Sequence, residues 1–295
     1  MQTKLQIEQL LCLAGVRPNK RYGQNFLIDL NLMRVFLDKA SLTEKDLVLE
    51  VGCGTGSLTQ GIAEHAGRVV AVDIDPTMAE IAADELEGFQ NVEIINTDIL
   101  AKKHELSEEV MAKVRAAREN CDGRFLLVAN LPYNAASPLM ANLVTGDMHV
   151  DAMYVTVQKE VAMRMAAKPG GKDYGPLTVL LQARGKVEIF RILKPDVFWP
   201  RPDVESAMVE YEYSTEMAGR IKDLELFKDC VNLFMSHRRK MMKACVKFTD
   251  GRLEKVDDWS MVFSKCGIDG TVRGEQISVA DYIKISNMCF DLLQQ

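Results

Sequence analysis

The sequence predicts an α/β fold, in which a mostly parallel, Rossmann-like sheet is followed by a small helical region. Short apolar runs recur up to about residue 213, with amphipathic stretches between several of them, as in sheets whose parallel strands are joined by helices. One run leads directly into a glycine-rich turn at residues 52–56 and then into a helical pattern, the order found in nucleotide-binding folds. Beyond residue 214 the strand-like pattern stops. We therefore expect two domains, residues 1–213 and residues 214–295.

Length and composition agree with this division. The chain has 295 residues, 47% of them hydrophobic, which is enough for one large α/β domain and a smaller one. The formal net charge is -6 and the sequence pI is about 5.4. This balance argues against indiscriminate binding to nucleic acid, so any surface for a polyanion has to be local.

Cysteine and histidine usage indicates the compartment. The seven cysteines are dispersed without a C-x-x-C pair, and the four histidines show no ligand spacing. We expect reduced thiols in a cytosol, and neither a disulfide framework nor a metal site. Residues 1–16 predict a short amphipathic helix without the apolar region of a signal peptide. No run is long and apolar enough to span a membrane.

Residues 17–27, called the leader below, are polar, basic and aromatic. Pro18 and Gly23 predict a loop here, and a helix is expected over residues 31–40. The local chemistry fits a solvated segment and a ligand-contacting segment equally well, and both interpretations stay open at this point.

The glycine turn, Gly52-Cys53-Gly54-Thr55-Gly56, follows a predicted strand at residues 47–51 and precedes a helix from about Ser57. Glycines let the backbone approach a ligand closely, and the helix N-terminus presents free N–H groups. The pattern is G-x-G-x-G and not G-x-G-x-x-G, which favours S-adenosylmethionine over a dinucleotide. A purely structural turn is the alternative.

Acidic residues end the next two predicted strands. Asp73 follows residues 68–72 and is suited to accept both hydroxyls of a ribose, whereas Asp75 fits the N-cap of a helix that begins at Pro76. Asp98 follows the strand at residues 92–95 and is suited to accept from an exocyclic adenine amine. A capping or turn role for Asp98 is the alternative.

The stretch Asn130-Leu131-Pro132-Tyr133, called the 130–133 motif below, follows a buried strand at residues 125–129. It therefore lies at a strand's carboxyl end, where open α/β sheets bind ligands. It offers an amide, a carbonyl stiffened by the following proline, and an aromatic ring, none of which titrates near neutral pH. This set is suited to hold a flat, neutral ring that carries nitrogen.

The remaining chain predicts further elements in order. Residues 101–120 predict a polar helical crossover. Phe198 lies in a segment stiffened by Pro200 and Pro202, which is expected to hold its ring in a fixed pose. The other expected elements are a helix from about residue 137, a strand at 150–157, a helix at 158–167, a basic glycine-rich loop at 168–175, and strands at 185–193 and 205–213.

The chain concentrates positive charge near its C-terminal end. Residues 220–255 contain ten Lys or Arg and five Asp or Glu, a local net charge of +5. Several cations are spaced to share one helical face. The alternative is that these cations form a solvated helix face without a binding role. Because an otherwise acidic protein places its basic residues at two ends of the chain, we favour a surface for the phosphate backbone of a nucleic acid.

Together these stretches resemble the small-subunit ribosomal RNA adenine N6,N6-dimethyltransferases of the kasugamycin-resistance type. The resemblance covers about residues 17–243. It is carried by Arg21-Tyr22-Gly23-Gln24-Asn25-Phe26-Leu27, Glu50-Val51 with the glycine turn, the 130–133 motif with Asn134, Gln158-Lys159-Glu160-Val161, Tyr174-Gly175, Phe198 with Pro200 and Pro202, and Arg238-Arg239-Lys240.

The resemblance implies a seven-stranded class I methyltransferase sheet with a small all-helical C-terminal domain. It implies S-adenosyl-L-methionine as the cofactor, and a cytoplasmic, monomeric enzyme that acts on the immature small ribosomal subunit. Residues 1–213 form the methyltransferase domain, with residues 1–30 as its N-terminal part, and residues 214–295 contact RNA. The expected cofactor contacts are Asn25, Leu27, Gly52, Gly54, Asp73, Asp98 and Asn130.

For the chemistry, we expect the Asn130 side-chain oxygen and the Leu131 carbonyl to accept from the adenine N6 amine, with Pro132 stiffening the turn. Tyr133 and Phe198 are expected to sandwich the base. The expected RNA contacts are Arg21, Lys172, Arg238, Arg239, Lys240 and Lys243. Methylation of another adenine, for example in large-subunit RNA, and an assembly factor with incidental catalysis are the alternatives.

Overall fold

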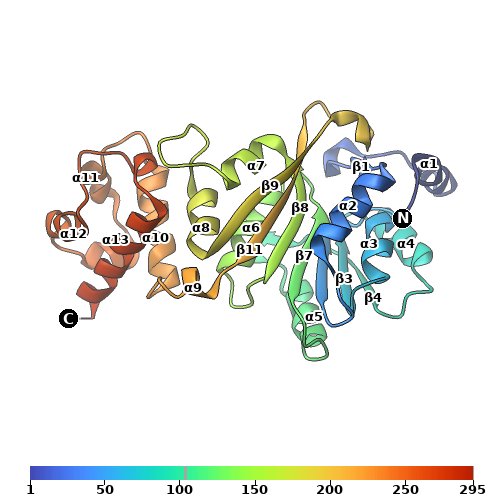
Figure 1. Cartoon of the computed structure of the whole chain (residues 1–295), viewed down its shortest axis with the longest axis horizontal. Coiled ribbons are helices and arrows are strands. Elements are labelled where there is room, and N and C mark those ends of the chain that lie inside the picture. Colours follow the sequence, from blue (N-terminus) through green and yellow to red (C-terminus); the bar gives the residue numbers. More distant parts are fainter. Residues whose placement is uncertain (103–104, 295) are drawn as a thin grey trace. The chain divides into compact units, whose positions relative to one another are not determined.

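The computed structural model describes residues 1–102 and 105–294 and contains a central sheet of seven strands (Figure 1). The strands run in the order β4-β3-β2-β7-β8-β11-β9, and the pairs from β4 to β8 are parallel. Their bounds are β2 Leu47–Val51, β3 Arg68–Asp73, β4 Val92–Asn96, β7 Phe125–Asn130, β8 Ala152–Gln158, β9 Gly185–Leu193 and β11 Ser206–Tyr213. This architecture confirms the predicted fold class.

The strand order reverses beside β2. The chain passes from β2 outward to β3 and β4, and then returns to β7 on the other side of β2. Ligands bind outside the carboxyl ends of the strands at such a switch point. The glycine turn and the 130–133 motif both emerge there, because they follow β2 and β7 directly.

Helices begin where capping chemistry predicts. Asp75 is the N-cap of α4, its side chain accepts from the Thr77 N–H at 3.0 Å, and Pro76 is the first helical residue. On one face of the sheet, Val48 and Leu126 pack in a common core with Phe36 of α2. The helices before α8 are α1 Lys4–Leu13, α2 Leu30–Ala40, α3 Ser57–Ala63, α4 Pro76–Glu85, α5 Glu108–Arg118, α6 Ala136–Thr145 and α7 Lys159–Met165.

The crossover at residues 101–120 differs from its prediction. Two short strands, β5 (Leu100–Lys102) and β6 (Glu105–Leu106), pair as an antiparallel hairpin, and helix α5 begins only at Glu108. The start fits the local sequence, because Ser107 is an extended N-cap residue and Glu108 and Glu109 place negative charge in the first turn. Residues 103 and 104 of the predicted helix lie outside the described residues.

The chain forms two compact units. Unit 1 comprises Met1–Ala162 with Glu188–Tyr211, and unit 2 comprises Met163–Val187 with Glu212–Gln295. Residues 163–187 were expected in the domain of residues 1–213, but they group with the C-terminal part. The physical reason is the core of unit 2, in which Tyr174 and Val179 pack with Phe234 and Tyr282.

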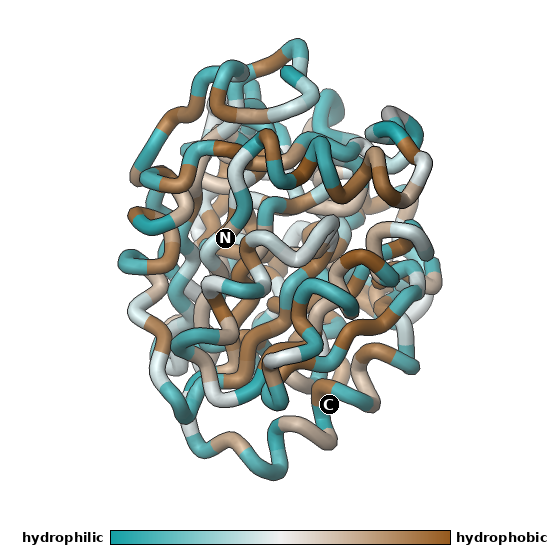
Figure 2. The backbone as a smooth tube through the Cα atoms, turned by 90° about the vertical axis from the view of Figure 1, so that its right-hand side faces the viewer, coloured by the Kyte–Doolittle hydropathy of each residue, from teal (hydrophilic) through white to brown (hydrophobic). Residues whose placement is uncertain are grey.

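Unit 2 is helical around this core. Phe234 of α10 has edge-on and tilted ring contacts with Trp259, Phe263 and Tyr282. The helices are α8 Pro176–Arg184, α9 Thr215–Ala218, α10 Leu224–Ser236, α11 Met242–Cys245, α12 Trp259–Cys266 and α13 Val279–Leu293. Figure 2 shows hydrophilic and hydrophobic residues interleaved along the chain, and no helix among the described residues is long and apolar enough to cross a membrane.

Candidate functional site

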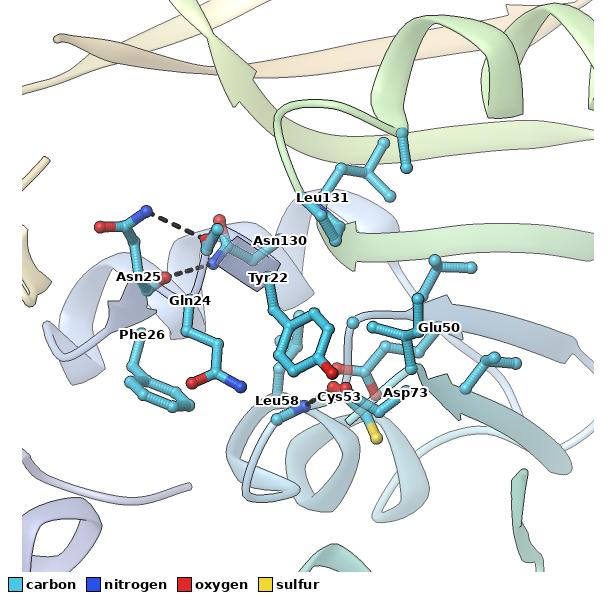
Figure 3. Close-up of a pocket in the computed structure, with 18 of the residues that line it drawn as sticks. Tyr22, Gln24, Asn25, Phe26, Glu50, Cys53, Leu58, Asp73, Asn130 and Leu131 are labelled. Carbon is cyan, nitrogen blue, oxygen red and sulfur yellow. Dashed lines mark hydrogen bonds between the residues drawn. The ribbon is translucent and has the colours of Figure 1, made fainter. Parts of the chain in front are cut away.

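A pocket of about 360 Å³ opens at the carboxyl ends of β2, β3 and β7, entirely within unit 1 (Figure 3). It gathers segments that are far apart in the sequence, namely the leader, the glycine turn, and the loops that follow β3, β4 and β7. The main lining stretches are residues 21–27, 50–55, 72–74, 97–100 and 130–135. The structure thus brings together all the predicted cofactor contacts and the whole 130–133 motif.

The glycine turn needs its glycines because of close neighbours. Gly52 and Gly54 have φ of 79° and 56°, in the left-handed region that favours glycine. A Cβ atom on Gly54 would lie 2.9 Å from the Phe26 ring, and one on Gly52 would lie 3.0 Å from the Pro132 ring. The glycine turn and the 130–133 motif are therefore packed directly against each other.

Asp73 fastens the loops around the pocket. Its Oδ2 accepts from the Gly54 N–H at 2.8 Å, and its Oδ1 accepts from the Asp75 N–H at 2.9 Å. Burial raises the pKa of the Asp73 carboxyl. Each carboxylate oxygen carries more than one lone pair, so this geometry leaves acceptor capacity for ribose hydroxyls.

Glu50 is a site residue that the sequence analysis did not assign. It lies in β2 just before the glycine turn, lines the pocket, and is 1% exposed. Its Oε2 has no hydrogen-bond partner among the described residues, and burial raises the pKa of its carboxyl to about 8. The signal in the sequence was a single carboxylate within the otherwise apolar run Leu47–Val51.

The Asn130 amide is held in one orientation. Its Nδ2 donates to the Asn25 carbonyl at 2.9 Å, and the Asn25 Nδ2 donates in turn to the Gly23 carbonyl at 3.0 Å (Figure 3). Nδ2 is engaged with the leader, and among the described residues no donor bonds to Oδ1, so Oδ1 can accept from a ligand. The Leu131 N–H donates to the Thr156 carbonyl of β8 at 3.0 Å, which anchors the turn to the sheet.

Tyr133 is fixed from its polar end. Its hydroxyl lies 2.9 Å from Ser206 Oγ of β11, and burial raises the pKa of the phenol. The hydroxyl is therefore a neutral anchor near pH 7, and Tyr133 is one of the residues that line the pocket.

Phe198 is not part of this pocket. It belongs to a short strand, β10 (Phe198–Trp199), that pairs antiparallel with β1 (Phe26–Leu27), and it is 3% exposed in the core of unit 1. The lining of this pocket therefore includes Tyr133 but not Phe198. The extended segment was predicted, but its pairing with the leader, which turns the ring inward, was not.

The leader is a packed wall of the pocket. Gln24 Nε2 donates to Asp75 Oδ2 at 2.8 Å, while Gln24 Oε1 accepts from the Asn19 N–H at 2.7 Å. Leu27 is buried, and Figure 3 shows the Tyr22 ring pointing into the pocket. These contacts favour the ligand-contacting interpretation of this segment over the solvated one.

Asp98 combines the two roles that were left open. Its Oδ1 accepts from the Leu100 N–H at 2.9 Å, which is a turn contact, and the residue also lines the pocket.

Among the residues that the structure describes, no group of three or more His, Cys, Asp or Glu side chains is arranged to hold a metal ion.

A family model described as ribosomal RNA adenine dimethylase matches residues 15–290. The chain belongs to this family. It is similar to ribosomal RNA small subunit methyltransferase A of Geobacillus thermodenitrificans, with 34% identity over 97% of this chain and 96% of that protein. The protein of the same name from Caldanaerobacter subterraneus is 35% identical over 95% of this chain and 100% of its own length.

Two solved structures share the fold of this family member. A dimethyladenosine transferase from Plasmodium falciparum has a TM-score of 0.69 at 21% identity and covers 88% of this chain and 95% of its own. The 23S rRNA methyltransferase ErmE has a TM-score of 0.61 at 22% identity, with coverages of 92% and 100%. The predicted family, fold and enzyme class are confirmed.

The predicted RNA contacts are distributed over both units of this adenine dimethylase. Arg21 lines the pocket in unit 1. In unit 2, Arg238 Nε pairs with Glu275 at 2.9 Å, and Arg238 Nη2 donates to the Lys172 carbonyl at 3.2 Å. This places the basic loop at 168–175 beside the basic segment, defined here as residues 236–247. Arg239, Lys240 and Lys243 are exposed.

The positions of Tyr133 and Phe198 lead to a paired prediction for methyl transfer. Tyr133→Leu removes a ring from the pocket and should lower transfer about 5- to 100-fold, the range expected for one lost base stack. Phe198→Leu leaves a small cavity in the core and should lower the free energy of unfolding by about 1 to 2 kcal/mol, with transfer within about threefold of the parent. Transfer rates and melting temperatures of both variants test this. If Phe198→Leu lost as much transfer as Tyr133→Leu at an unchanged melting temperature, the result would support stacking of the base between both rings.

Proposed function

We propose that this chain transfers methyl groups from S-adenosyl-L-methionine to N6 of two adjacent adenosines near the 3′ end of small-subunit ribosomal RNA, giving N6,N6-dimethyladenosines. The observation that carries the proposal is the oriented Asn130 amide, packed with its motif against a glycine turn that suits the cofactor. The names of the relatives, small subunit methyltransferase A, support the choice of RNA. We place the enzyme in the cytoplasm, as a monomer that acts on the immature small subunit.

The pocket fits the proposed cofactor in shape and charge. The glycine turn offers close backbone approach, Asp73 offers acceptors for ribose hydroxyls, and Asp98 suits the adenine amine. The unpaired Glu50 oxygen suits a cationic group. Asn25, Leu27, Gly52, Gly54 and Asn130 complete the proposed contacts. When bound, S-adenosylmethionine supplies a methyl group already activated by a sulfonium.

The chain's own contribution to the chemistry is orientation. The adenine N6 lone pair is delocalised into the ring, so the amine is a poor nucleophile until it is turned and pyramidalised. Asn130 Oδ1 and the Leu131 carbonyl accept hydrogen bonds from the two N6–H groups of the unmethylated adenosine. These two bonds direct the N6 lone pair toward the methyl group. No residue of the 130–133 motif titrates near neutral pH, so positioning is the motif's role.

The target base has to leave its stack to enter the pocket, as enzymes that modify bases generally require. Tyr133 provides a stacking face, which its hydroxyl contact with Ser206 holds in place. Pro132 lacks an N–H and packs against Gly52, so it stiffens the turn that carries both acceptors. The second transfer needs room for the methyl group that the first one adds.

We assign RNA binding to Arg21, Lys172, Arg238, Arg239, Lys240 and Lys243, and we propose residues 214–295 as the main RNA-contacting domain. The exposed Arg239, Lys240 and Lys243 are suited to phosphate contacts. Arg238 has a second function, because its pair with Glu275 and its bond to the Lys172 carbonyl hold two basic stretches together.

The triple variant Arg239→Ala, Lys240→Ala, Lys243→Ala should bind RNA more weakly and with a flatter salt dependence. Each lost phosphate contact reduces the slope of log affinity against log salt by about one. A matched control removes three cations of unit 2 that are already paired with carboxylates, namely Lys222, Lys228 and Lys284. The control should leave the slope nearly unchanged. Equal slopes in the parent and the triple variant would make the basic segment a solvated face.

The proposed function is tested by offering the purified protein labelled S-adenosylmethionine and unmethylated small subunits, and then mapping the modified bases. Two adjacent dimethyladenosines near the 3′ end are the expected result. Label confined to large-subunit RNA would favour another adenine methyltransferase. RNA binding without label would favour an assembly factor.

A further inference from the structure

Unit 2 carries an aromatic stack on its surface. The rings of His237 and Phe248 lie with centroids 4.1 Å apart and planes 11° from parallel. Phe248 is 47% exposed, unlike the buried aromatic rings of Phe227, Phe234 and Tyr282 in the core of the same unit. The exposed Phe248 ring therefore presents a flat aromatic face on which a ligand ring can stack.

Local hydrogen bonds hold the His237 ring and the backbone turn that carries Phe248. His237 Nδ1 donates to the Leu233 carbonyl at 3.2 Å, which fixes the imidazole at the end of α10. Phe248 ends the short 3-10 helix Val246–Phe248, and the following Thr249 hydroxyl donates to the Val246 carbonyl at 3.2 Å. The stack is therefore preformed, so a ligand that packs on it orders few side chains.

Positive charge lies beside the stack and along the same stretch of sequence. The Lys240 ammonium lies 5.5 Å from the Phe248 ring centroid. Arg239, Lys243 and Lys247 are exposed within the same stretch, and among the described residues none of these four cations has a carboxylate within 4 Å. Arg238, by contrast, is neutralised by Glu275. The Phe248 ring thus lies beside one cation, Lys240, in a stretch whose other exposed cations, apart from Arg238, have no close ion pair among the described residues.

We infer that the His237–Phe248 stack is a docking site for an unpaired nucleobase of the RNA substrate. A base offers a flat π-face for the ring, and the adjoining phosphates offer the anions that the four cations lack. A duplex would satisfy the cations but would keep its bases stacked and away from Phe248. The inference rests on the proposed function, which identifies the partner as RNA. It adds a second contact with an unpaired base, made by residues far in sequence from the 130–133 motif.

The test measures binding of the full-length chain to a 12-nucleotide single-stranded RNA and to the same sequence as a duplex, over a range of salt concentrations. Phe248→Ala should weaken binding of the single strand about 5- to 100-fold, as expected for the loss of one stack. It should change duplex binding by less than about twofold and should leave the salt slope unaltered. Phe248→Trp should retain the parent affinity. Met241→Ala is the matched control, since Met241 is an exposed apolar residue (43%) of the same segment.

Three results would overturn the inference. Equal losses on the single strand and the duplex, or a failure of Phe248→Trp to restore affinity, would make Phe248 a packing residue. Unchanged RNA binding together with weakened binding of a polyglutamate peptide would indicate an acidic protein partner. Phe248→Leu, compared at a matched melting temperature, covers the case in which the alanine variant folds poorly, and it should also lose single-strand affinity. This test measures only RNA binding, so it can contradict the docking site while base mapping still supports the methyltransferase assignment. Base mapping can likewise contradict that assignment while the binding results support the docking site.

Discussion

Replacing Asn130 by alanine should lower methyl transfer by a factor of about one hundred or more and should lower cofactor affinity far less, because Asn130 is only one of several proposed cofactor contacts. The reason is that the Asn130 amide is oriented by its bond to the Asn25 carbonyl, so that Oδ1 is free to accept from N6. Loss of such a positioning contact removes alignment of the reacting atoms. Single-turnover transfer from labelled S-adenosylmethionine, measured beside equilibrium cofactor binding, checks this.

Two further variants sharpen the result. Asn120→Ala removes an asparagine at the end of α5, outside the pocket lining, and should transfer at the parent rate. Asn130→Asp keeps an acceptor oxygen but loses the N–H that bonds to Asn25, so its transfer should fall between the parent and the alanine variant. Near-normal turnover of Asn130→Ala would remove the residue from the proposed chemistry.

Replacing Glu50 by glutamine should make the protein more stable than the parent at pH 8 and should weaken cofactor binding there. In the folded protein the pKa of Glu50 is about 8, whereas its ordinary value is 4.5. Between these values the folded state holds a proton that the unfolded chain has lost. The free energy of unfolding of the parent therefore falls as pH rises through this window, by at most about 1.4 kcal/mol per pH unit. Glutamine has no such proton, so the variant lacks this fall.

Urea unfolding at several pH values between 5 and 8 measures the stability difference, and calorimetric titration with S-adenosylmethionine measures the binding. The parent should bind the cationic cofactor more tightly as Glu50 ionises, and Glu50→Gln should lose this pH dependence. Glu210 is a matched control, because it is also buried but its carboxylate pairs with Lys39 Nζ at 2.6 Å. Glu210→Gln should destabilise the protein. Parallel stability profiles for the parent and Glu50→Gln would contradict the role of the buried carboxyl.

The parts of the fold that could be predicted from the sequence are those set by short-range patterns. The apolar run of β2, the glycine turn and the Asp75 cap each depend on neighbours within a few residues, and each is found where it was expected. The 130–133 motif could also be placed, because a buried strand directly precedes it.

The residues that escaped prediction depend on contacts between distant segments. Phe198 turns inward because its strand pairs with Phe26–Leu27, which lies about 170 residues earlier in the chain. Arg238 finds Glu275, 37 residues later. The lone carboxylate of Glu50 in the apolar run of β2 was visible in the sequence, but its burial beside Asp73 was not. Pairing partners and burial are properties of the assembled fold, so local spacing does not contain them.

The contact between Gly52 and Pro132 has a consequence for the two successive methylations. The glycine turn on the side of the methyl donor contacts the 130–133 motif on the side of the adenosine through backbone and the Pro132 ring. The distance between the bound methyl donor and the bound adenosine is therefore set by the protein scaffold and not by either ligand. The same spacing then applies to the first and the second transfer on a given adenosine. We expect any difference between the two rates to arise from the adenosine itself. After the first transfer its N6 carries one N–H group fewer, so it donates one hydrogen bond fewer to Asn130 or Leu131, and it carries the bulk of a methyl group.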